Sequence, residues 1–177
     1  MANLKIENLN PATDIDIISS WDIQFENDKR YDSIKHFILE DNIFYGLGEV
    51  INTNYEIYPI GKNERKYAFA LKTSSNKLIG FILALVCDIP TPSPELIIQY
   101  IVLHPEYQNK GFGKKALSEL INNSNKYLQT NIGSVFARID ITNKASLKTF
   151  NKLGFSFEES SSQFVKATYK LPENIKE

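Results

Sequence analysis

Residues 104–116 (HPEYQNKGFGKKA) are the part of this chain best suited to chemistry, because they join a predicted apolar strand to a predicted amphipathic helix. Gly111 and Gly113 let the backbone approach a ligand closely, since neither residue carries a Cβ. The helix that they open presents unpaired N–H groups and the positive end of its dipole, which together attract anions. Lys110 and Lys114 add positive charge beside it. The pattern therefore predicts a site for a phosphate-bearing ligand.

Two other phosphate-binding patterns do not fit this segment. Residues 111–116 formally match a dinucleotide fingerprint, but that loop follows its strand directly, whereas seven residues separate Leu103 from Gly111. The fingerprint also expects an acidic residue near positions 131–133, and none occurs there. A P-loop requires Gly, four residues and then Gly-Lys-Ser/Thr, an order that the sequence lacks.

A second segment begins at Asn143 and ends at residues 153–155 (Leu-Gly-Phe). Taken alone, it predicts an Asn N-cap, a short helix and a Gly C-cap. Together, the two segments resemble the GNAT superfamily of N-acetyltransferases. In that family a Gln/Arg-x-x-Gly-x-Gly/Ala loop, here Gln108–Gly113, precedes a helix, a strand and an Asn-led helix ending in Leu-Gly-Phe. The resemblance is strong over residues 97–155 and weak in sequence before Lys66, where such proteins build their acceptor sites.

The resemblance implies that acetyl-CoA is the co-substrate and that no metal is needed. Backbone groups of residues 101–103 would hold the pantetheine arm and the acetyl carbonyl, where their strand splays from a parallel neighbour at 134–141. Amides of residues 109–114 would wrap the pyrophosphate, Asn143 would bind the pantetheine, and the helix from 146 to 150 would flank the thiol. The implied cofactor-binding residues are Ile101, Val102, Leu103, Gln108, Asn109, Lys110, Gly111, Phe112, Gly113, Lys114, Asn143, Ser146 and Phe150.

Such a site holds the acceptor amine and the thioester together and offers N–H donors to the developing oxyanion. The amine must also lose a proton, to a carboxylate or to an ordered water. Glu95, at the start of the central strand, and Asp140, at the end of its neighbour, are the predicted catalytic residues. Glu49 and Glu56, in the preceding loop, are rival candidates, and a solvating surface carboxylate is the commoner fate of such residues.

Phe150 departs from the family pattern, in which many members have a Tyr that protonates the leaving thiolate. A phenyl ring cannot donate a proton. Either water serves as the acid, or a hydroxyl of Tyr100, Ser146 or Thr149 substitutes, or the activity is low. We favour water, with Phe150 as an apolar core residue facing the cofactor. The departure also supports an alternative function, a coenzyme A-binding regulatory or sensor module, although 177 residues leave no room for an attached effector domain.

The elements that must position these residues follow from hydrophobic periodicity. Alternation and turn residues predict a strand, a helix and a further helix near 30–39. The loop that follows at 41–62 is either a substrate-facing lid or an exposed connector. Beyond it we expect strands at 66–72, 77–86, 96–103 and 134–141, helices at 111–128 and 144–153, and a closing hairpin of 155–159 with 163–171. This order predicts an α/β (α+β) fold, a mixed sheet with helices on both faces. The resemblance adds that the sheet is mostly antiparallel, with one splayed parallel pair.

Composition bounds the remaining possibilities. With 42% hydrophobic and 23% charged residues, the 177-residue chain is expected to form one globular domain, 1–177. A net charge of −1 without a basic stripe argues against nucleic acid as a partner. The single cysteine, Cys87, excludes an intrachain disulfide. No apolar run approaches the roughly 20 residues of a membrane span, so we expect a cytoplasmic protein. The resemblance implies that its acceptor is a small-molecule or peptide amine. The edge strands expected near the C-terminus are compatible with a homodimer.

Overall fold

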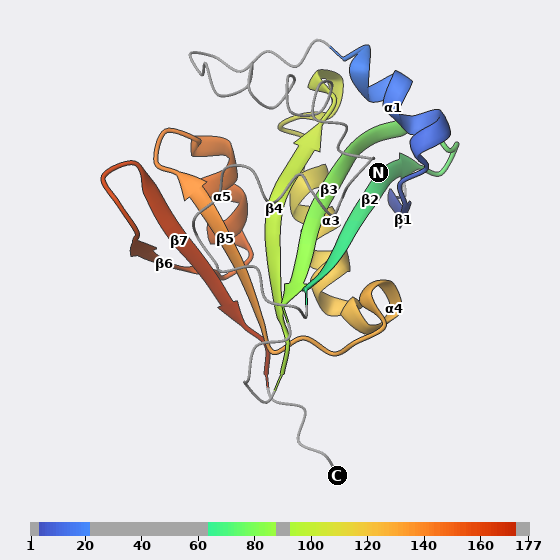
Figure 1. Cartoon of the computed structure of the whole chain (residues 1–177). Coiled ribbons are helices and arrows are strands. Elements are labelled where there is room, and N and C mark those ends of the chain that lie inside the picture. The colour runs from blue at the N-terminus through green and yellow to red at the C-terminus, as the bar shows by residue number, and fades with distance from the viewer. Residues whose placement is uncertain (1–3, 22–63, 88–92, 173–177) are drawn as a thin grey trace.

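The computed structural model describes residues 4–21, 64–87 and 93–172, and the structural statements below concern these residues. The predicted helix near 30–39 and the 41–62 loop, with Glu49 and Glu56, lie outside them. The elements, labelled as in Figure 1, are β1 (Leu4–Asn8), α1 (Pro11–Ser19), β2 (Glu64–Thr73), β3 (Leu78–Cys87), β4 (Glu95–Leu103), the 3-10 helix η1 (Pro105–Tyr107), α3 (Phe112–Asn122), α4 (Ser124–Leu128), β5 (Ser134–Asp140), α5 (Lys144–Lys152), β6 (Ser156–Glu159) and β7 (Phe164–Lys170).

The strands form one seven-stranded sheet in the order β1-β2-β3-β4-β5-β7-β6. Every neighbouring pair is antiparallel except β4 and β5, which run parallel. The main core lies between the sheet and α3, α4 and α5, with α3 supplying Ala116, Leu117, Leu120 and Ile121. On the opposite face, Ile18 of α1 and Trp21 pack with alternate residues of β3 and β4. The predicted mixed sheet with helices on both faces is therefore confirmed.

The parallel pair separates along its length. Pairing runs from Glu95 opposite Ser134 to Ile98 opposite Ala137 and then stops, although both strands continue. On its other side, β4 carries a bulge, because Leu83 lies opposite Tyr100 while the adjacent Ala84 lies opposite Ile98. Bulges bend a strand and increase its twist. In Figure 1 the β5–β7–β6 half accordingly meets β4 at the bottom and leans away from it toward the top.

Burial along β4 follows this separation. Residues 96–98 are buried, whereas 99–101 and 103 are only half-buried. The nearly continuous apolar run of residues 96–103 predicts a strand covered on both faces. The neighbouring β3, of which all but the last residue are buried, has such burial along its length. The second half of β4 departs from the prediction because β5 no longer lies beside the strand. We call the diverging parts, residues 99–103 of β4 and 138–140 of β5, the fork.

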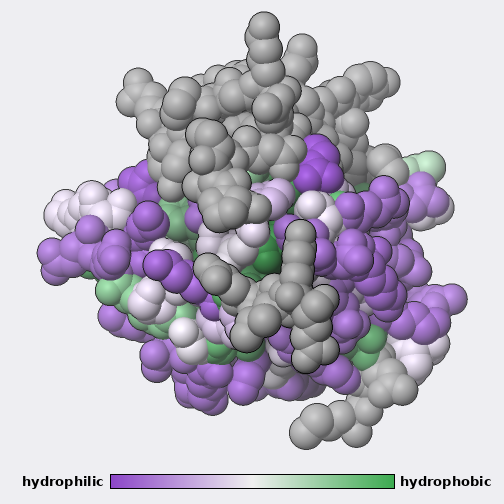
Figure 2. All heavy atoms as spheres, turned by 90° about the horizontal axis from the view of Figure 1, so that it is seen from below, coloured by the Kyte–Doolittle hydropathy of each residue, from purple (hydrophilic) through white to green (hydrophobic). Residues whose placement is uncertain are grey.

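The predicted helix 111–128 is in fact two helices, α3 and α4, which meet at Asn123. The Asn123 side chain donates to the Glu119 carbonyl at 3.3 Å, and its backbone leaves the helical range at φ −119° and ψ 33°. Asn and Ser side chains compete for backbone hydrogen bonds in this way, which explains a break at an Asn-Asn-Ser run. No helix in the described part of the chain is long and apolar enough to cross a membrane. Seen from below, the coloured surface in Figure 2 is mostly hydrophilic, with small scattered hydrophobic patches.

Candidate active site

The loop that leaves β4 is fastened to the end of that strand. The Gln108 side chain reaches back and donates from Nε2 to the Leu103 carbonyl at 3.0 Å. Edge-to-face ring contacts brace the same loop, since Tyr107 lies 6.0 Å from His104 and 5.7 Å from Phe112 between ring centroids. Gln108 and Phe112, both predicted to bind cofactor, thus also hold the loop in shape.

Beyond this fastening, the backbone turns sharply into α3. Asn109 and Gly111 both have positive φ, 56° and 81°, the left-handed conformation that glycine tolerates best. Such turns direct successive N–H groups toward one side and form anion-binding concavities. A Cβ placed on Gly111 would meet no atom within 4 Å, so space is open beside this residue.

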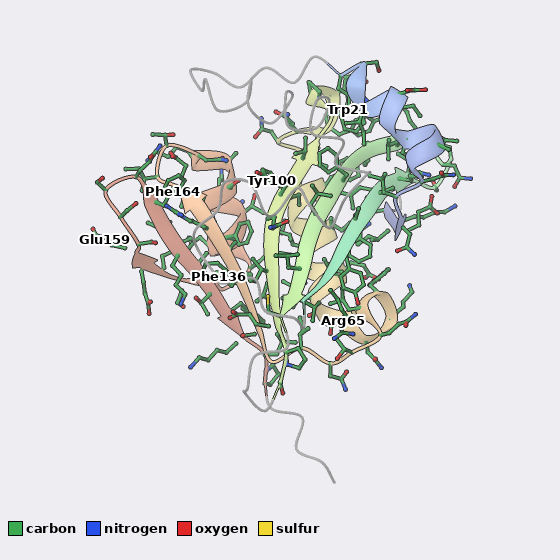
Figure 3. The ribbon with its side chains drawn as sticks, in the orientation of Figure 1. Trp21, Arg65, Tyr100, Phe136, Glu159 and Phe164 are labelled. Carbon is green, nitrogen blue, oxygen red and sulfur yellow. The ribbon has the colours of Figure 1, made fainter. Side chains whose placement is uncertain are left out.

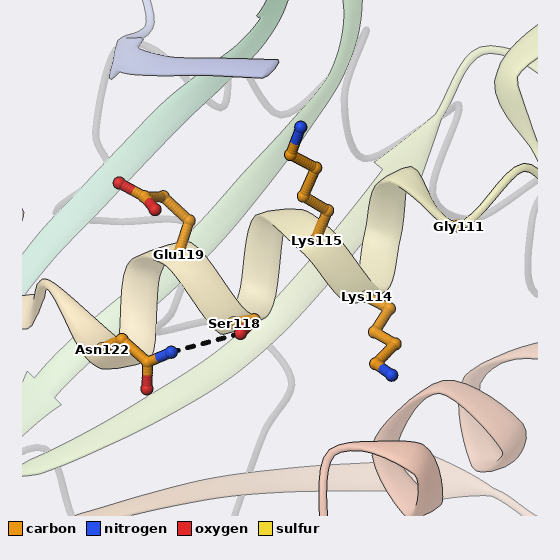
Figure 4. Close-up of a pocket in the computed structure, with 6 residues that line it drawn as sticks. All are labelled: Gly111, Lys114, Lys115, Ser118, Glu119 and Asn122. Atoms are coloured by element: carbon orange, nitrogen blue, oxygen red, sulfur yellow. Dashed lines mark hydrogen bonds between the residues drawn. The ribbon is translucent and has the colours of Figure 1, made fainter. Parts of the chain in front are cut away.

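Among the described residues, no side chain caps the N-terminus of α3. Its first intrahelical hydrogen bond runs from the Lys115 N–H to the Gly111 carbonyl at 3.0 Å, which leaves the amides of residues 112–114 without helical acceptors. Figure 4 shows Lys114 extending toward α5 and Lys115 toward the opposite side. A shallow surface hollow of about 290 Å³ follows this outer side of α3, from Gly111 to Asn122.

The first turn of α3 lies directly on the fork. A Cβ on Gly113 would sit 3.6 Å from Cδ1 of Ile101 and 3.7 Å from Cδ1 of Leu103, which are ordinary contact distances. The position that a Cβ of Gly113 would occupy therefore faces β4. The sequence had instead predicted that this glycine leaves space for a ligand. Ile101 and Leu103 point into the main core, and Val102 points to the α1 face. The unpaired amides of α3 are thereby held at the open end of the fork.

The second motif brings another helix N-terminus to the same end. Asn143 caps α5, accepting from the Ser146 N–H on its Oδ1 at 3.0 Å. Its side-chain NH₂ makes no hydrogen bond with the residues that the structure describes, so it is available as a donor. Because Asn143 follows β5 and α5 packs against α3, both predicted binding motifs meet at the fork, on one face of the sheet.

Phe150 lies in the core of this arrangement. Its side chain is 2% exposed, and its ring meets that of Phe155 edge-on at 4.8 Å. This placement agrees with the interpretation of Phe150 as an apolar core residue. Among the hydroxyls considered as substitutes for the missing Tyr, that of Thr149 donates to the Ala145 carbonyl at 2.9 Å within its own helix.

The two predicted bases occupy opposite ends of the parallel pair. Glu95 lies at the closed end, where its Oε1 accepts from the Ser134 hydroxyl at 3.0 Å. The fork is about 17 Å of extended strand away from it, near Tyr100, so Glu95 lies outside the fork. Asp140 ends β5 at the open end, and its Oδ1 accepts from both the N–H and the hydroxyl of Thr142. Of the two, Asp140 is the one placed beside the binding motifs.

Sequence reasoning did not single out Arg138 and Lys166, which face each other across β5 and β7 beside the fork. The available signal was a charged residue inside the mostly apolar strand Ser134–Asp140. No group of three or more potential metal ligands occurs within the described ranges.

Comparisons with known proteins agree with this geometry. The acetyltransferase (GNAT) family profile matches residues 22–155, well over half of the chain. No curated protein matches it significantly in sequence. Among solved structures, the chain is similar to PaiA N-acetyltransferase from Thermoplasma acidophilum, in complex with coenzyme A, at 17% identity and a TM-score of 0.63, over 96% of this chain and 99% of that one.

Two further structures are similar. The spermidine N-acetyltransferase from Vibrio cholerae, in complex with CoA and spermine, has 19% identity and a TM-score of 0.60 over 93% of each chain. The N-acetyltransferase PseH from Campylobacter jejuni, in complex with acetyl coenzyme A, has 17% identity and a TM-score of 0.58 over 96% of this chain and 100% of that one. At these identities the structures establish the fold, and the family profile establishes the kinship. The chain belongs to the GNAT family and is an acetyl-CoA-dependent N-acetyltransferase.

Proposed function

We propose that this enzyme moves the acetyl group of acetyl-CoA to a primary amine of a small molecule or a peptide by direct attack. The observation that carries the proposal is the fork. There the parallel pair opens after Ile98 and Ala137, beside the uncapped N-terminus of α3. A separated strand pair leaves β4 without a neighbour on one edge, and a bound chain can lie along that edge.

The residues present suit the phosphate end of acetyl-CoA. Three helix amides without helical acceptors, the open space at Gly111 and the exposed ammonium groups of Lys110 and Lys114 would hold the pyrophosphate. The NH₂ group of Asn143 would donate to the pantetheine arm. Acetyl-CoA supplies an activated thioester, from which the amine nitrogen takes the acetyl group as the thiolate leaves.

The amine reaches the fork from the other face of the sheet. Both helix N-termini that would hold the cofactor lie on the α3 and α5 face, so the opposite face remains for the acceptor. Asp140 is the carboxylate that this arrangement supports as proton acceptor, directly or through a water, because it lies at the open end. Glu95 is a poorer candidate for the base, because it accepts from the Ser134 hydroxyl and lies at the closed end of the parallel pair.

Thiol release from acetyl-CoA, measured with a thiol-reactive chromophore, tests the proposal. A panel of polyamines, aminoglycosides, amino acids and peptides should contain an acceptor that raises release well above the hydrolysis background. Mass spectrometry of the product should then show the acetyl group on a primary amine. Tight coenzyme A binding without stimulation by any member of the panel would favour a sensor module instead.

A pair of charge reversals tests the cofactor site by calorimetric titration with coenzyme A. Lys110→Glu with Lys114→Glu places two negative charges beside the α3 N-terminus and should weaken coenzyme A binding by roughly 10-fold or more, since both new charges repel the phosphates. Lys152→Glu, a single exposed reversal at the far end of α5, is the control for negative charge added away from the site and should bind normally. Equal affinity of both variants, measured by calorimetry, would place the pyrophosphate elsewhere.

A further inference from the structure

Two positive side chains, Arg138 and Lys166, lie directly opposite each other on β5 and β7. Like charges in directly opposed positions destabilise a sheet, so this pairing calls for a compensating group. The positions share the sheet face of Phe136, because residues two apart on a strand point the same way. Phe136 packs there with Leu85 and Ile97, on the face opposite the main core.

The positive charges find no anion within the described part of the chain. The Nε atom of Arg138 is buried and has no hydrogen-bond partner among the described residues. The Arg138 guanidinium lies 4.0 Å from the Phe164 ring centroid, and the Lys166 ammonium lies 5.4 Å from that of Phe136. Aromatic faces attract cations but accept no conventional hydrogen bond, so the N–H groups retain capacity for an acceptor.

Nearby carboxylates do not supply this acceptor. Asp140 accepts from the N–H and the hydroxyl of Thr142, and among the described residues it forms no ion pair within 4.0 Å with Arg138 or Lys166. Glu158 occupies the position opposite Lys166 on the exposed edge strand β6, yet the described residues show no ion pair between them within 4.0 Å. The result is a partly buried cationic pair flanked by two phenyl rings.

The pair lies where an acceptor would enter. Arg138 is the first residue of β5 beyond the last paired residue, Ala137, and so begins one arm of the fork. Figure 3 shows Tyr100 on β4 and Phe136 on β5, on the two sides of the region where the halves part, and Phe164 farther out on β7. Tyr100 packs with the α1-side cluster, so it shares the face of Arg138 rather than that of the cofactor motifs.

We infer that Arg138 and Lys166 bind an anionic group of the acceptor, so that the substrate is an amine that also carries a carboxylate or a phosphate. The inference rests on the proposed function and narrows its substrate class. A planar guanidinium and an ammonium side by side suit an oxyanion, which can accept from both. A polyamine would instead bring further positive charge to two cations for which the described residues supply no anion.

Matched acceptors in the thiol-release assay separate these cases. Leucine is compared with leucinamide, glucosamine 6-phosphate with glucosamine, and both pairs with spermidine. We expect the anionic member of at least one pair to have the higher kcat/KM, and the pair that responds distinguishes carboxylate from phosphate. A preference for spermidine or for both neutral members would overturn the inference while leaving the proposed function intact.

Variants then assign the preference to the two residues. Arg138→Gln and Lys166→Gln should each raise the KM for the anionic acceptor by about 10- to 100-fold, the range for a hydrogen bond to a charged group. The KM for its neutral partner and the affinity for coenzyme A should hardly change. Lys170→Gln is the control, because it lies on the same strand and face but opposite Ser134, at the closed end of the parallel pair. Arg138→Lys retains the charge and covers the case in which Arg138→Gln fails to fold.

Binding of acetylated products gives a readout that does not need turnover. Calorimetry on the protein–coenzyme A complex compares N-acetylleucine with N-acetylleucinamide, and N-acetylglucosamine 6-phosphate with N-acetylglucosamine. The inference is supported if an anionic product binds more tightly than its neutral partner and Lys166→Gln abolishes the difference. This holds even if no acceptor is turned over, because a lack of turnover would count against the proposed function alone. Equal affinities of wild type and both Gln variants for the anionic products would refute the inference.

Discussion

Gly111 and Gly113, at the start of α3, differ in what their backbone positions require, and alanine substitutions should separate the two requirements. Gly111 has a φ of 81° with open space where a Cβ would stand. Gly111→Ala therefore introduces no clash, and its cost is that of an L-residue in the left-handed region, about 1–2 kcal/mol. We expect the free energy of unfolding to fall by that amount, or the loop to relax and coenzyme A binding to weaken instead.

Gly113 lies inside the first turn of α3, where alanine is favoured over glycine by up to about 1 kcal/mol. A Cβ at this position would lie 3.6 Å from Ile101 and 3.7 Å from Leu103, so neither side chain has to move to make room for it. Gly113→Ala should therefore keep or slightly raise stability. It should also keep coenzyme A affinity, because the backbone N–H is unchanged and the new methyl faces β4.

Urea unfolding and calorimetric titration with coenzyme A measure both effects on each variant. The reasoning is refuted if Gly113→Ala unfolds like the wild type but loses coenzyme A affinity, since its methyl would then face the ligand. Unchanged stability and affinity in Gly111→Ala would show that the left-handed turn is not needed. Each variant serves as the structural control for the other.

Three further substitutions test the cap of α5, the core at Phe150 and an ion pair between β1 and β2. Asn143→Asp keeps an acceptor for the Ser146 N–H and so should retain stability, but it loses the NH₂ donor and should weaken coenzyme A binding in calorimetry. Phe150→Tyr puts a hydroxyl at a side chain that is 2% exposed and should lower the free energy of unfolding by about 1–3 kcal/mol. A rise in the single-turnover rate would show instead that the hydroxyl reaches the thiol. The Glu7 carboxylate raises the pKa of Lys72 in the folded protein above its ordinary 10.5. The pair therefore stabilises the fold fully below pH 10.5, and this stabilisation is lost as the pH rises through the pKa of Lys72 in the folded protein. Urea unfolding of Lys72→Met should therefore show a shallower alkaline loss of stability than the wild type.

The sequence predicted those parts of the site that depend on neighbouring residues. Asn143 caps α5 and Gly111 opens α3, as their spacing predicted, because both act within three or four positions. The left-handed turn at Gly111 is a finding of the structure. The break at Asn123 is also local, and a continuous apolar periodicity concealed it. The family resemblance supplied the parallel pair and its divergence, which no local pattern contains.

Nonlocal register decided the rest. Glu95 begins β4 and Asp140 ends β5, so a parallel pair that opens at its carboxyl ends separates them. Open sheets bind ligands beyond the carboxyl ends of parallel strands, and strand direction would have favoured Asp140 over Glu95. The pairing of Arg138 with Lys166 depends on where β7 aligns with β5, which periodicity does not fix.

A single parallel pair inside an otherwise antiparallel sheet has a direct consequence for the site. Because β4 and β5 run the same way, both of their following helices, α3 and α5, begin at the same edge of the sheet. An antiparallel β5 would end at the opposite edge and carry Asn143 and the second helix dipole away from the phosphate loop. Divergence of the pair at that edge then connects the two faces, with helix N-termini on one side and the Arg138 face on the other. The direction of one strand thus brings the uncapped N-terminus of α3 and a cationic face to the same opening, although no local contact within either motif requires it.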